Sequence, residues 1–307
     1  TIRTFKLSQL MGIDSEILIV RKPIHELKPF SSGYVFSKKV FIDEDGNRIP
    51  KNYQKSVYKK KILIIGDSVA FGNGVIEENT FVGLLRKKYN EFEFINTSVP
   101  GYDLFHFEGS FQKISNYENI EKIFYFLTLN DVLSSNSIAP WHKRNKKKLN
   151  KELGFVQKII NNEYLRNLNF YLRNKSYTFM FVKGVLTDPS KRWYSNINLF
   201  YTENKIDHLN SYLKNLIELS KIKKANLHLV ILPYEFQTRN CKMIETPLPQ
   251  LKIRKQLDFL QINFSDFFHD FCKVKNPKKL FYKFDPMHLS LKGHKKVFEL
   301  IDHEANF

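Results

Sequence analysis

Short apolar runs alternate with amphipathic stretches along most of the chain beyond residue 60. The run at 61–66 ends in a glycine, as a buried strand of a parallel sheet commonly does. The pattern that follows predicts further strands at 92–96, 122–129, 226–232 and 261–264, and helices at 80–89, 104–115, 206–220, 250–259 and 290–301. Because strands alternate with helices, we expect an α/β fold with helices on both faces of a parallel sheet.

Two regions interrupt this rhythm. Residues 1–58 are rich in loop-forming residues and suggest an extended arm, in which 41–48 have the pattern of a strand entering a glycine turn. The segment at about 134–204 holds a basic run and then helical and aromatic stretches. We therefore expect an N-terminal arm at 1–58 and a main domain at 59–307, with an insertion at about 134–204.

Composition narrows the class of protein. The chain of 307 residues is 42% hydrophobic, which is enough for a sizeable core. No apolar run reaches the length that a membrane-spanning helix needs, and a start at Thr1 is compatible with a signal or membrane anchor removed upstream. Cys241 and Cys272 have no metal-binding spacing, and the sequence leaves open whether they pair or are buried thiols.

The net charge of +18 can mark a nucleic-acid, membrane-surface or anionic-polymer partner. The basic residues are mostly lysines, mixed with many Asn, Ile and Phe, as an AT-rich genome encodes. Compositional bias is the simpler explanation, and we expect no nucleic-acid partner.

Candidate chemistry begins at Gly66-Asp67-Ser68, directly after the first predicted strand. A serine between a strand and a helix can expose its hydroxyl at the sheet edge, where backbone N–H groups can face an oxyanion. The same tripeptide alone is more often a turn in which the serine caps a helix.

Three further signals lie at the ends of other predicted strands. Gly101 follows the second strand and Asn130 the third, and Asp285 precedes His288 by three residues after the last strand. Each is more often a turn residue when it stands alone. Together they lie at the carboxyl edge of one predicted sheet, where open α/β sheets bind ligands. There, Asp285 can orient the His288 ring toward the Ser68 hydroxyl.

These four blocks resemble, in order, the sequence blocks of SGNH (GDSL-like) hydrolases. The continuations GDSVAFGNGV at 66–75 and HLSLKGH at 288–294 are similar to esterases of bacterial polysaccharide gene clusters. The resemblance covers about residues 60–303 apart from the middle segment. It implies a flavodoxin-like three-layer α/β/α sandwich with a central parallel sheet, and acyl-ester chemistry without a metal or other cofactor.

The resemblance also implies roles. Ser68 becomes the nucleophile, His288 its base and Asp285 the residue that orients the base, while Ser68 N–H, Gly101 N–H and the Asn130 side chain become oxyanion donors. Thr128 stands where the third block usually has glycine, which adds a Cβ near the oxyanion region. The Gly-x-Ser-x-Gly motif of α/β-hydrolases is absent, which argues against that fold. Residues at the same edge are candidate substrate contacts: Tyr102, Tyr234, Gln237 and Arg239.

We therefore expect a serine esterase or O-acyltransferase that removes or transfers acetyl groups on a bacterial glycan. Three alternatives stay open: a lipase or lysophospholipase, a non-catalytic glycan-binding protein on the same scaffold, and nucleic-acid binding through the lysine-rich middle segment. We expect the insertion to select substrate through aromatic and basic residues, namely Trp141, Tyr164, Tyr171, Tyr177, Trp193, Tyr194, Lys143, Arg144, Lys146, Lys147 and Lys148. The alternative for each of these residues is that the aromatics form a satellite core and the lysines a solvated face. The bacterial envelope is favoured slightly over the cytoplasm, and the sequence leaves the oligomeric state open.

Overall fold

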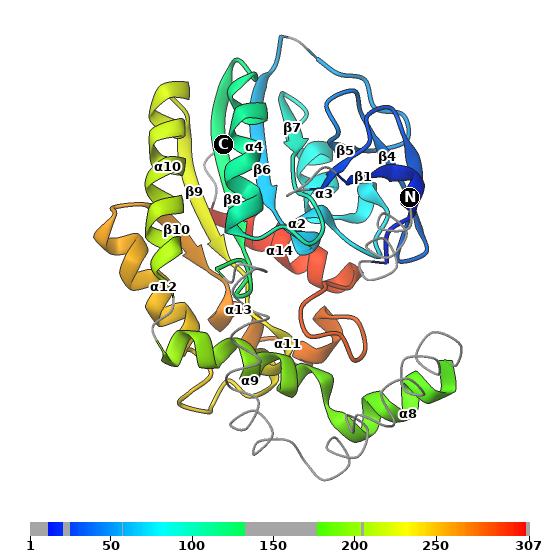
Figure 1. Ribbon diagram of the computed structural model, residues 1–307, viewed down its shortest axis with the longest axis vertical. Helices are drawn as coiled ribbons and strands as arrows, with labels where there is room; N and C mark the ends of the chain where they lie inside the picture. Colours follow the sequence, from blue (N-terminus) through cyan, green and yellow to red (C-terminus); the bar gives the residue numbers. More distant parts are fainter. Residues whose placement is uncertain (1–11, 21–24, 57, 133–176, 204–205, 305–307) are drawn as a thin grey trace.

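The computed structural model describes residues 12–20, 25–56, 58–132, 177–203 and 206–304 (Figure 1). Its centre is an eight-stranded sheet with the order β10-β9-β8-β6-β7-β5-β4-β3. Five of these strands pair in parallel: β6 (Lys60–Gly66), β7 (Phe92–Asn96), β8 (Ile120–Leu127), β9 (Asn226–Ile231) and β10 (Asn263–Asp266).

The parallel strands have the flavodoxin-like order. Read along the sheet from β7, their order in the sequence is second, first, third, fourth and fifth. The chain leaves β6 toward β7 on one side and later returns to β8 on the other side, so the switch point lies at β6. The predicted flavodoxin-like α/β/α fold is therefore confirmed, and such a switch point is where open α/β sheets bind ligands.

Helices cover both faces of the sheet because alternate residues of each buried strand point to opposite sides. In β6, Leu63 and Ile65 join a core with α4 (Leu104–Ser115) and α10 (Asp207–Lys223). Ile62 and Ile64 instead join a second core with α2 (Ser68–Phe71), α3 (Phe81–Lys88) and α14 (Leu291–Glu304). Figure 1 shows α4 and α10 in front of the sheet and α14 behind it.

The N-terminal region contributes three antiparallel strands to the same sheet. They are β3 (Ser32–Val35), β4 (Lys38–Ile42) and β5 (Arg48–Ile49), and β5 joins β7 through the pair Arg48 and Asn96. A separate two-stranded sheet is formed by β1 (Leu18–Val20) and β2 (His25–Leu27), after the short turn η1 (Ser15–Ile17). The expected strand at 41–48 overlaps β4 and β5, and the structure adds β3 to it.

The turn between β3 and β4 explains why sequence reasoning did not find this hairpin. Phe36 and Ser37 both have left-handed backbones, with φ of 46° and 62°. Two-residue hairpin turns of this kind usually carry Asn-Gly or Asp-Gly, which tolerate positive φ. A Phe-Ser pair carries no such signal.

The described part of the insertion is helical and lies beyond the carboxyl ends of the parallel strands (Figure 1). It contains α8 (Tyr177–Thr187) and α9 (Pro189–Thr202), and α9 packs on α11 (Glu235–Arg239) and α12 (Leu248–Phe259). Tyr194 is buried, whereas Trp193 is 38% exposed. The other insertion side chains that we expected to contact substrate, from Trp141 to Tyr177, lie outside the side chains that the structure describes.

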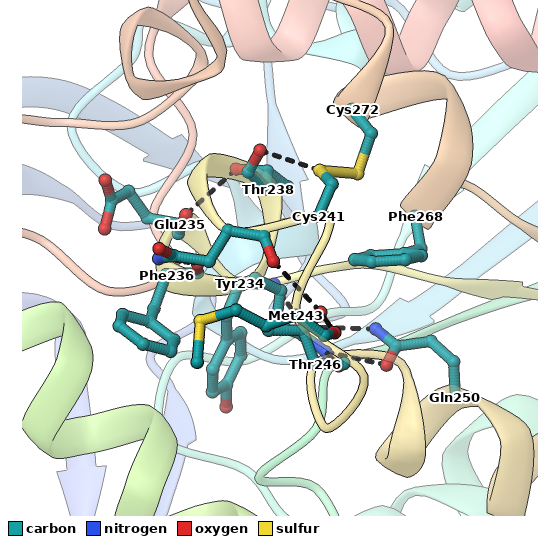
Figure 2. Close-up of a disulfide and its surroundings, with 12 residues drawn as sticks. Tyr234, Glu235, Phe236, Thr238, Cys241, Met243, Thr246, Gln250, Phe268 and Cys272 are labelled. Carbon is teal, nitrogen blue, oxygen red and sulfur yellow. Dashed lines mark hydrogen bonds between the residues drawn. A yellow bond between two sulfur atoms is a disulfide. The ribbon is translucent and has the colours of Figure 1, made fainter.

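The remaining elements are η2 (Glu77–Asn79), α13 (Phe268–Cys272) and η3 (Pro277–Leu280). Figure 2 shows the disulfide between Cys241 and Cys272, which joins the turn after α11 to the end of α13 with Cα atoms 6.0 Å apart. The two cysteines therefore pair, a point that the sequence left open. Across the described ranges, no helix combines the length and the apolarity needed to cross a bilayer.

Candidate active site

Ser68, His288 and Asp285 form a continuous hydrogen-bonded chain. Ser68 is the first residue of α2, immediately after β6, and its Oγ lies 2.8 Å from Nε2 of His288. Nδ1 of His288 lies 2.8 Å from Oδ2 of Asp285. These are ordinary hydrogen-bond lengths, and the order of atoms is that of a nucleophile, a base and a carboxylate that orients the base.

The loop that carries Asp285 and His288 is held on both sides. Phe281 and Leu289 form an antiparallel bridge at its base, and Tyr282 N–H donates to the His288 carbonyl at 3.0 Å. Within the loop, Asp285 Oδ1 accepts the backbone N–H of His288 at 2.8 Å. These contacts fix the rotation of the carboxylate, so that its second oxygen faces the imidazole.

Charge and burial set the protonation of the pair. Burial lowers the pKa of His288, but the negative charges of Asp285 and Asp67 raise it more, and the net pKa lies above 6.5. Burial raises the pKa of Asp285, but His288 and two backbone N–H groups lower it further, and the net pKa lies below 3.8. Asp285 therefore stays ionised at neutral pH, where it can stabilise an imidazolium at His288.

The three predicted oxyanion donors follow three neighbouring strands. Ser68 follows β6, Gly101 comes after β7, and Asn130 comes after β8, with β6 lying between the other two strands. Gly101 is exposed and has φ of +80°, a left-handed conformation that favours glycine. The topology thus brings the three groups to the same switch point.

The amide of Asn130 is oriented by Tyr234. The Tyr234 hydroxyl donates to Asn130 Oδ1 and is itself contacted by the side chain of Trp193. Because Oδ1 is occupied as an acceptor, Nδ2 is the donor group of Asn130. It also hydrogen-bonds the buried carboxyl group of Asp67, so one of its two N–H bonds remains for an oxyanion. Tyr234 is 1% exposed, so this predicted substrate contact instead positions Asn130 from within the protein.

Thr128 connects two buried carboxyl groups. Its Oγ1 lies 2.9 Å from Oδ2 of Asp67 and 2.9 Å from Oδ1 of Asp131. A hydroxyl has one hydrogen and can donate to only one of them, so the second contact requires a proton on a carboxyl group. Burial raises the pKa of both acids, and the charge of Asp67 raises that of Asp131 further. Asp131 is therefore the acid of this pair that holds a proton more readily.

The position of Thr128 also shows where the Cβ that replaces the usual glycine lies. Thr128 is 1% exposed and its hydroxyl is engaged with Asp67 and Asp131. The Cβ of Thr128, which glycine would lack, therefore lies in the interior of the protein and is not exposed to a substrate.

Sequence reasoning missed Arg48, which comes from β5. Its guanidinium is fully buried and donates to the carbonyls of Phe71 at 2.5 Å, Gly72 at 2.8 Å and Val75 at 2.5 Å. Burial lowers its pKa to about 10, so it stays charged at neutral pH. Arg48 thereby holds the end of the short helix that starts at Ser68. No local motif around residue 48 indicates this contact.

Phe36 was also missed. It lies at the tip of the β3–β4 hairpin, is 45% exposed, and places its ring centroid 5.4 Å from that of His288. Its N–H donates to the carbonyl of Gly12 at 2.9 Å, which holds the tip of the hairpin. Positive φ at a bulky residue next to a reactive group is a common mark of functional strain.

The other predicted substrate contacts lie inside the protein. Tyr102 is 4% exposed, and its hydroxyl donates to the His25 carbonyl at 2.7 Å. Gln237 is fully buried and exchanges amide hydrogen bonds with Gln250. Neither offers surface to a substrate in this arrangement.

Arg239 is partly exposed and paired. Its Nη2 lies 2.5 Å from Asp188 Oδ1, and its Nε donates to Glu235 at 3.1 Å. These ion pairs tie α11 to the start of α9 and raise the pKa of the guanidinium against the effect of burial.

No protein-family model matches this chain, and no curated protein sequence matches it. Among solved structures, a lipolytic protein of the G-D-S-L family from Veillonella parvula is 11% identical and aligns over 80% of this chain and 97% of its own, with a TM-score of 0.44. An acetyl xylan esterase is 15% identical over 80% and 100%, with a TM-score of 0.46. A variant of an acetyl xylan esterase from Geobacillus stearothermophilus is 16% identical over 81% and 95%, with a TM-score of 0.44.

The three-layer fold itself is established by the strand order of this chain.

Proposed function

We propose that this chain is a serine-dependent acyl-ester hydrolase or acyltransferase of the SGNH type. The observation that carries the proposal is the continuous chain from Ser68 Oγ through His288 to Asp285, with 2.8 Å at both contacts. A serine hydroxyl within hydrogen-bond reach of an imidazole, itself oriented by a carboxylate, is the arrangement of nucleophilic acyl transfer.

The proposed reaction has two halves. Ser68 Oγ attacks the ester carbonyl carbon while His288 Nε2 takes its proton, and the resulting oxyanion is stabilised by Ser68 N–H, Gly101 N–H and Asn130 Nδ2. His288 then returns the proton to the leaving alkoxide, and the acyl group stays on Ser68. In the second half, water or a hydroxyl group attacks the acyl-enzyme, and His288 again accepts and returns a proton.

Asp285 serves both halves without reacting. Its carboxylate accepts from Nδ1 of His288, which leaves Nε2 as the atom that faces Ser68. Its low pKa keeps it ionised when His288 becomes an imidazolium.

The proposed substrate is an acetylated bacterial glycan. Support comes from the residues at 66–75 and 288–294, which are similar to esterases of polysaccharide gene clusters. The disulfide between Cys241 and Cys272 is typical of proteins in oxidising compartments and supports a place in the cell envelope.

Labelling with a fluorophosphonate, together with hydrolysis of p-nitrophenyl acetate, tests the proposal. The wild-type protein should be labelled on Ser68, and Ser68→Ala should abolish both labelling and turnover while circular dichroism stays unchanged. Ser220→Ala, on α10 and away from the site, is the matched control and should behave as wild type. Near-normal turnover by Ser68→Ala would exclude this mechanism.

A second measurement separates hydrolysis from transfer. Acetylated glycan is supplied with an unacetylated oligosaccharide as acceptor, and acetate and acetylated acceptor are both quantified. A hydrolase releases acetate whatever the acceptor concentration, whereas a transferase forms acetylated acceptor at the expense of acetate.

A further inference from the structure

Two cavities border the loop that carries Asp285 and His288, and they share wall residues. The first, of about 510 Å³, is lined by the loop after α2 around Gly74, by Lys38 of β4, and by residues 290–292. The second, of about 660 Å³, is lined by the start of α9, by α11, and by residues 276–284. Lys279 and Tyr282 line both cavities, so the two meet at these side chains.

The walls come from segments directly attached to the proposed catalytic residues. Ser290 closely follows His288, and Phe284 immediately precedes Asp285. The hydroxyl of Ser190 in the second cavity lies 3.4 Å from the Asp285 carbonyl. Both cavities therefore border the loop that carries Asp285 and His288.

The shape at the junction is rigid. Tyr282 donates its hydroxyl to the Gly74 carbonyl at 2.6 Å. A Cβ at Gly74 would lie 2.9 Å from the Tyr282 ring, and Gly74 also has φ of +79°. Glycine is therefore required where the loop and the ring meet. A preformed cleft of this kind loses little conformational entropy when a ligand binds.

The charge of the cavities is strongly positive. Five exposed lysines line them: Lys38, Lys278, Lys279, Lys283 and Lys292. Within the ranges that the structure describes, none of the five has a carboxylate partner. The acidic residues in the walls are Asp188 and Glu235, and both are already bound to Arg239. A concave surface lined by one sign of charge concentrates ligands of the opposite sign.

Apolar side chains line the two cavities alongside the lysines. The first cavity contains Ile76 and Leu291, which are 42% and 57% exposed, and the second contains Phe284. The ammonium of Lys283 lies 5.1 Å from the centre of the Phe284 ring, which places a cation beside an aromatic face. Apolar walls with a few placed charges are typical of ligand sites.

We propose that the two cavities form one binding groove, the lysine groove, for the anionic backbone of an extended acylated glycan that passes the catalytic loop in both directions. This inference rests on the proposed function and names its substrate class: a polymer with carboxylate or phosphate groups on both sides of the acylated sugar. A small neutral ester would occupy neither cavity and would need none of the five lysines.

The experiment compares two triple variants with the same change in charge. K278Q/K279Q/K283Q removes three lysines of the groove, and K214Q/K221Q/K255Q removes three exposed lysines of α10 and α12 that line neither cavity. Each is assayed on acetylated polyuronate, acetylated neutral xylan and p-nitrophenyl acetate. The groove variant should raise KM for acetylated polyuronate roughly tenfold, because three exposed ion pairs are lost. Turnover of the two neutral substrates should stay at the wild-type level.

The salt dependence of KM and a second variant test the proposal independently. In the wild type, KM for acetylated polyuronate should rise with added NaCl, and this rise should be smaller in the groove variant. K38Q/K292Q changes only the other end of the groove and should raise the same KM, even if the triple variant disturbs the catalytic loop and loses p-nitrophenyl acetate hydrolysis.

Three outcomes would overturn the proposal. Equal effects of the groove and control triples would show that net charge alone matters. Equal wild-type KM values for acidic and neutral acetylated polymers would show that the groove selects no charge. Binding of duplex DNA by the Ser68→Ala protein as tight as that of deacetylated polyuronate would assign the lysines to a general anion surface. In each case the wild-type protein would still hydrolyse p-nitrophenyl acetate, whereas failure of the proposed function would remove that activity as well.

Discussion

The parallel strands and the N-terminal strands contribute to the site in different ways. The parallel strands β6, β7 and β8 lead directly into Ser68, Gly101 and Asn130, the groups proposed to react or to stabilise charge. The N-terminal strands β2 to β5 contribute groups that hold or border these loops. Arg48 binds three carbonyls at the end of α2, and Phe36 lies beside His288.

His25 is another N-terminal residue that supports a loop of the parallel region. Its Nε2 lies 2.8 Å from the carbonyl of Pro100, the residue before Gly101, so β2 supports the loop that carries a proposed oxyanion donor. The groups proposed to react therefore lie close to strand ends, whereas their placement depends on strands from a distant part of the chain. Substitutions in the two regions should therefore differ in kind: the first should change kcat, and the second should change stability or KM.

Among the groups that support the nucleophile and its base, the largest kinetic effect is expected for one that follows a parallel strand. Asn130→Ala should lower kcat for p-nitrophenyl acetate by about 10²–10³-fold, as removal of one oxyanion donor does, with little change in KM. Tyr234→Phe removes the hydroxyl that orients Asn130 and should have a smaller effect of the same kind. If Asn130→Ala raises only KM, Asn130 contacts substrate in its ground state and the oxyanion role is wrong.

Arg48→Met should give the largest loss of stability in the N-terminal region. The buried carbonyls of Phe71, Gly72 and Val75 lose their donor, which should cost at least about 3 kcal/mol in the free energy of unfolding. Urea denaturation measures this loss. Arg254→Met is the matched control, since Arg254 is 41% exposed and 3.9 Å from Asp266, and it should cost less than about 1 kcal/mol. Similar losses for the two variants would contradict the structural role of Arg48.

Thr128→Val tests the buried carboxyl pair within the parallel region. Valine keeps the shape of the side chain but removes the hydroxyl between Asp67 and Asp131, which should lower stability by about 1–2 kcal/mol. The comparison of urea denaturation curves at pH 7 checks the value. An unchanged or increased stability would mean that the hydroxyl does not link the two acids.

The pH dependence tests the base itself. His288 must be neutral to accept the Ser68 proton, and its pKa lies above 6.5 because Asp285 and Asp67 outweigh the opposite effect of burial. Below that pKa, kcat/KM should fall about tenfold for each pH unit. Asp285→Asn removes one of these charges, so the midpoint of the fall should move to lower pH while kcat also decreases. A flat profile from about pH 5 to 9 would exclude a histidine base.

The smallest effect is expected at the hairpin tip. Phe36→Ala removes an exposed ring beside His288 and should change KM or the preference between acetyl and butyryl esters by less than about tenfold. Kinetics with p-nitrophenyl acetate and butyrate measure this ratio. Phe30→Ala, at a residue that is 81% exposed, is the control and should leave the ratio unchanged. An identical acetyl-to-butyryl preference for Phe36→Ala and the wild type would show that Phe36 does not contact the substrate.

The periodicity of apolar residues alone was sufficient to predict most strands and helices of the parallel region. The predicted strand at 92–96 and helix at 104–115 match β7 and α4, and the other predicted elements of this region differ from the observed ones by a few residues. These elements bury continuous apolar runs or one apolar face, so the pattern in the sequence directly reflects their environment. The site residues of this region follow from the same pattern, because parallel strands place their carboxyl ends at one edge.

The sequence by itself determined which groups carry the proposed chemistry, since Ser68, Gly101, Asn130 and the Asp285–His288 pair each lie next to a recognisable strand end or motif. Only the tertiary structure decided what holds them in place. Arg48, Phe36 and the lysines of the groove act through contacts between residues far apart in the chain, and no local pattern encodes such contacts. Tyr102 and Gln237 show the converse: each lies at the edge that the sequence indicated, but packing of neighbouring elements turned their side chains inward.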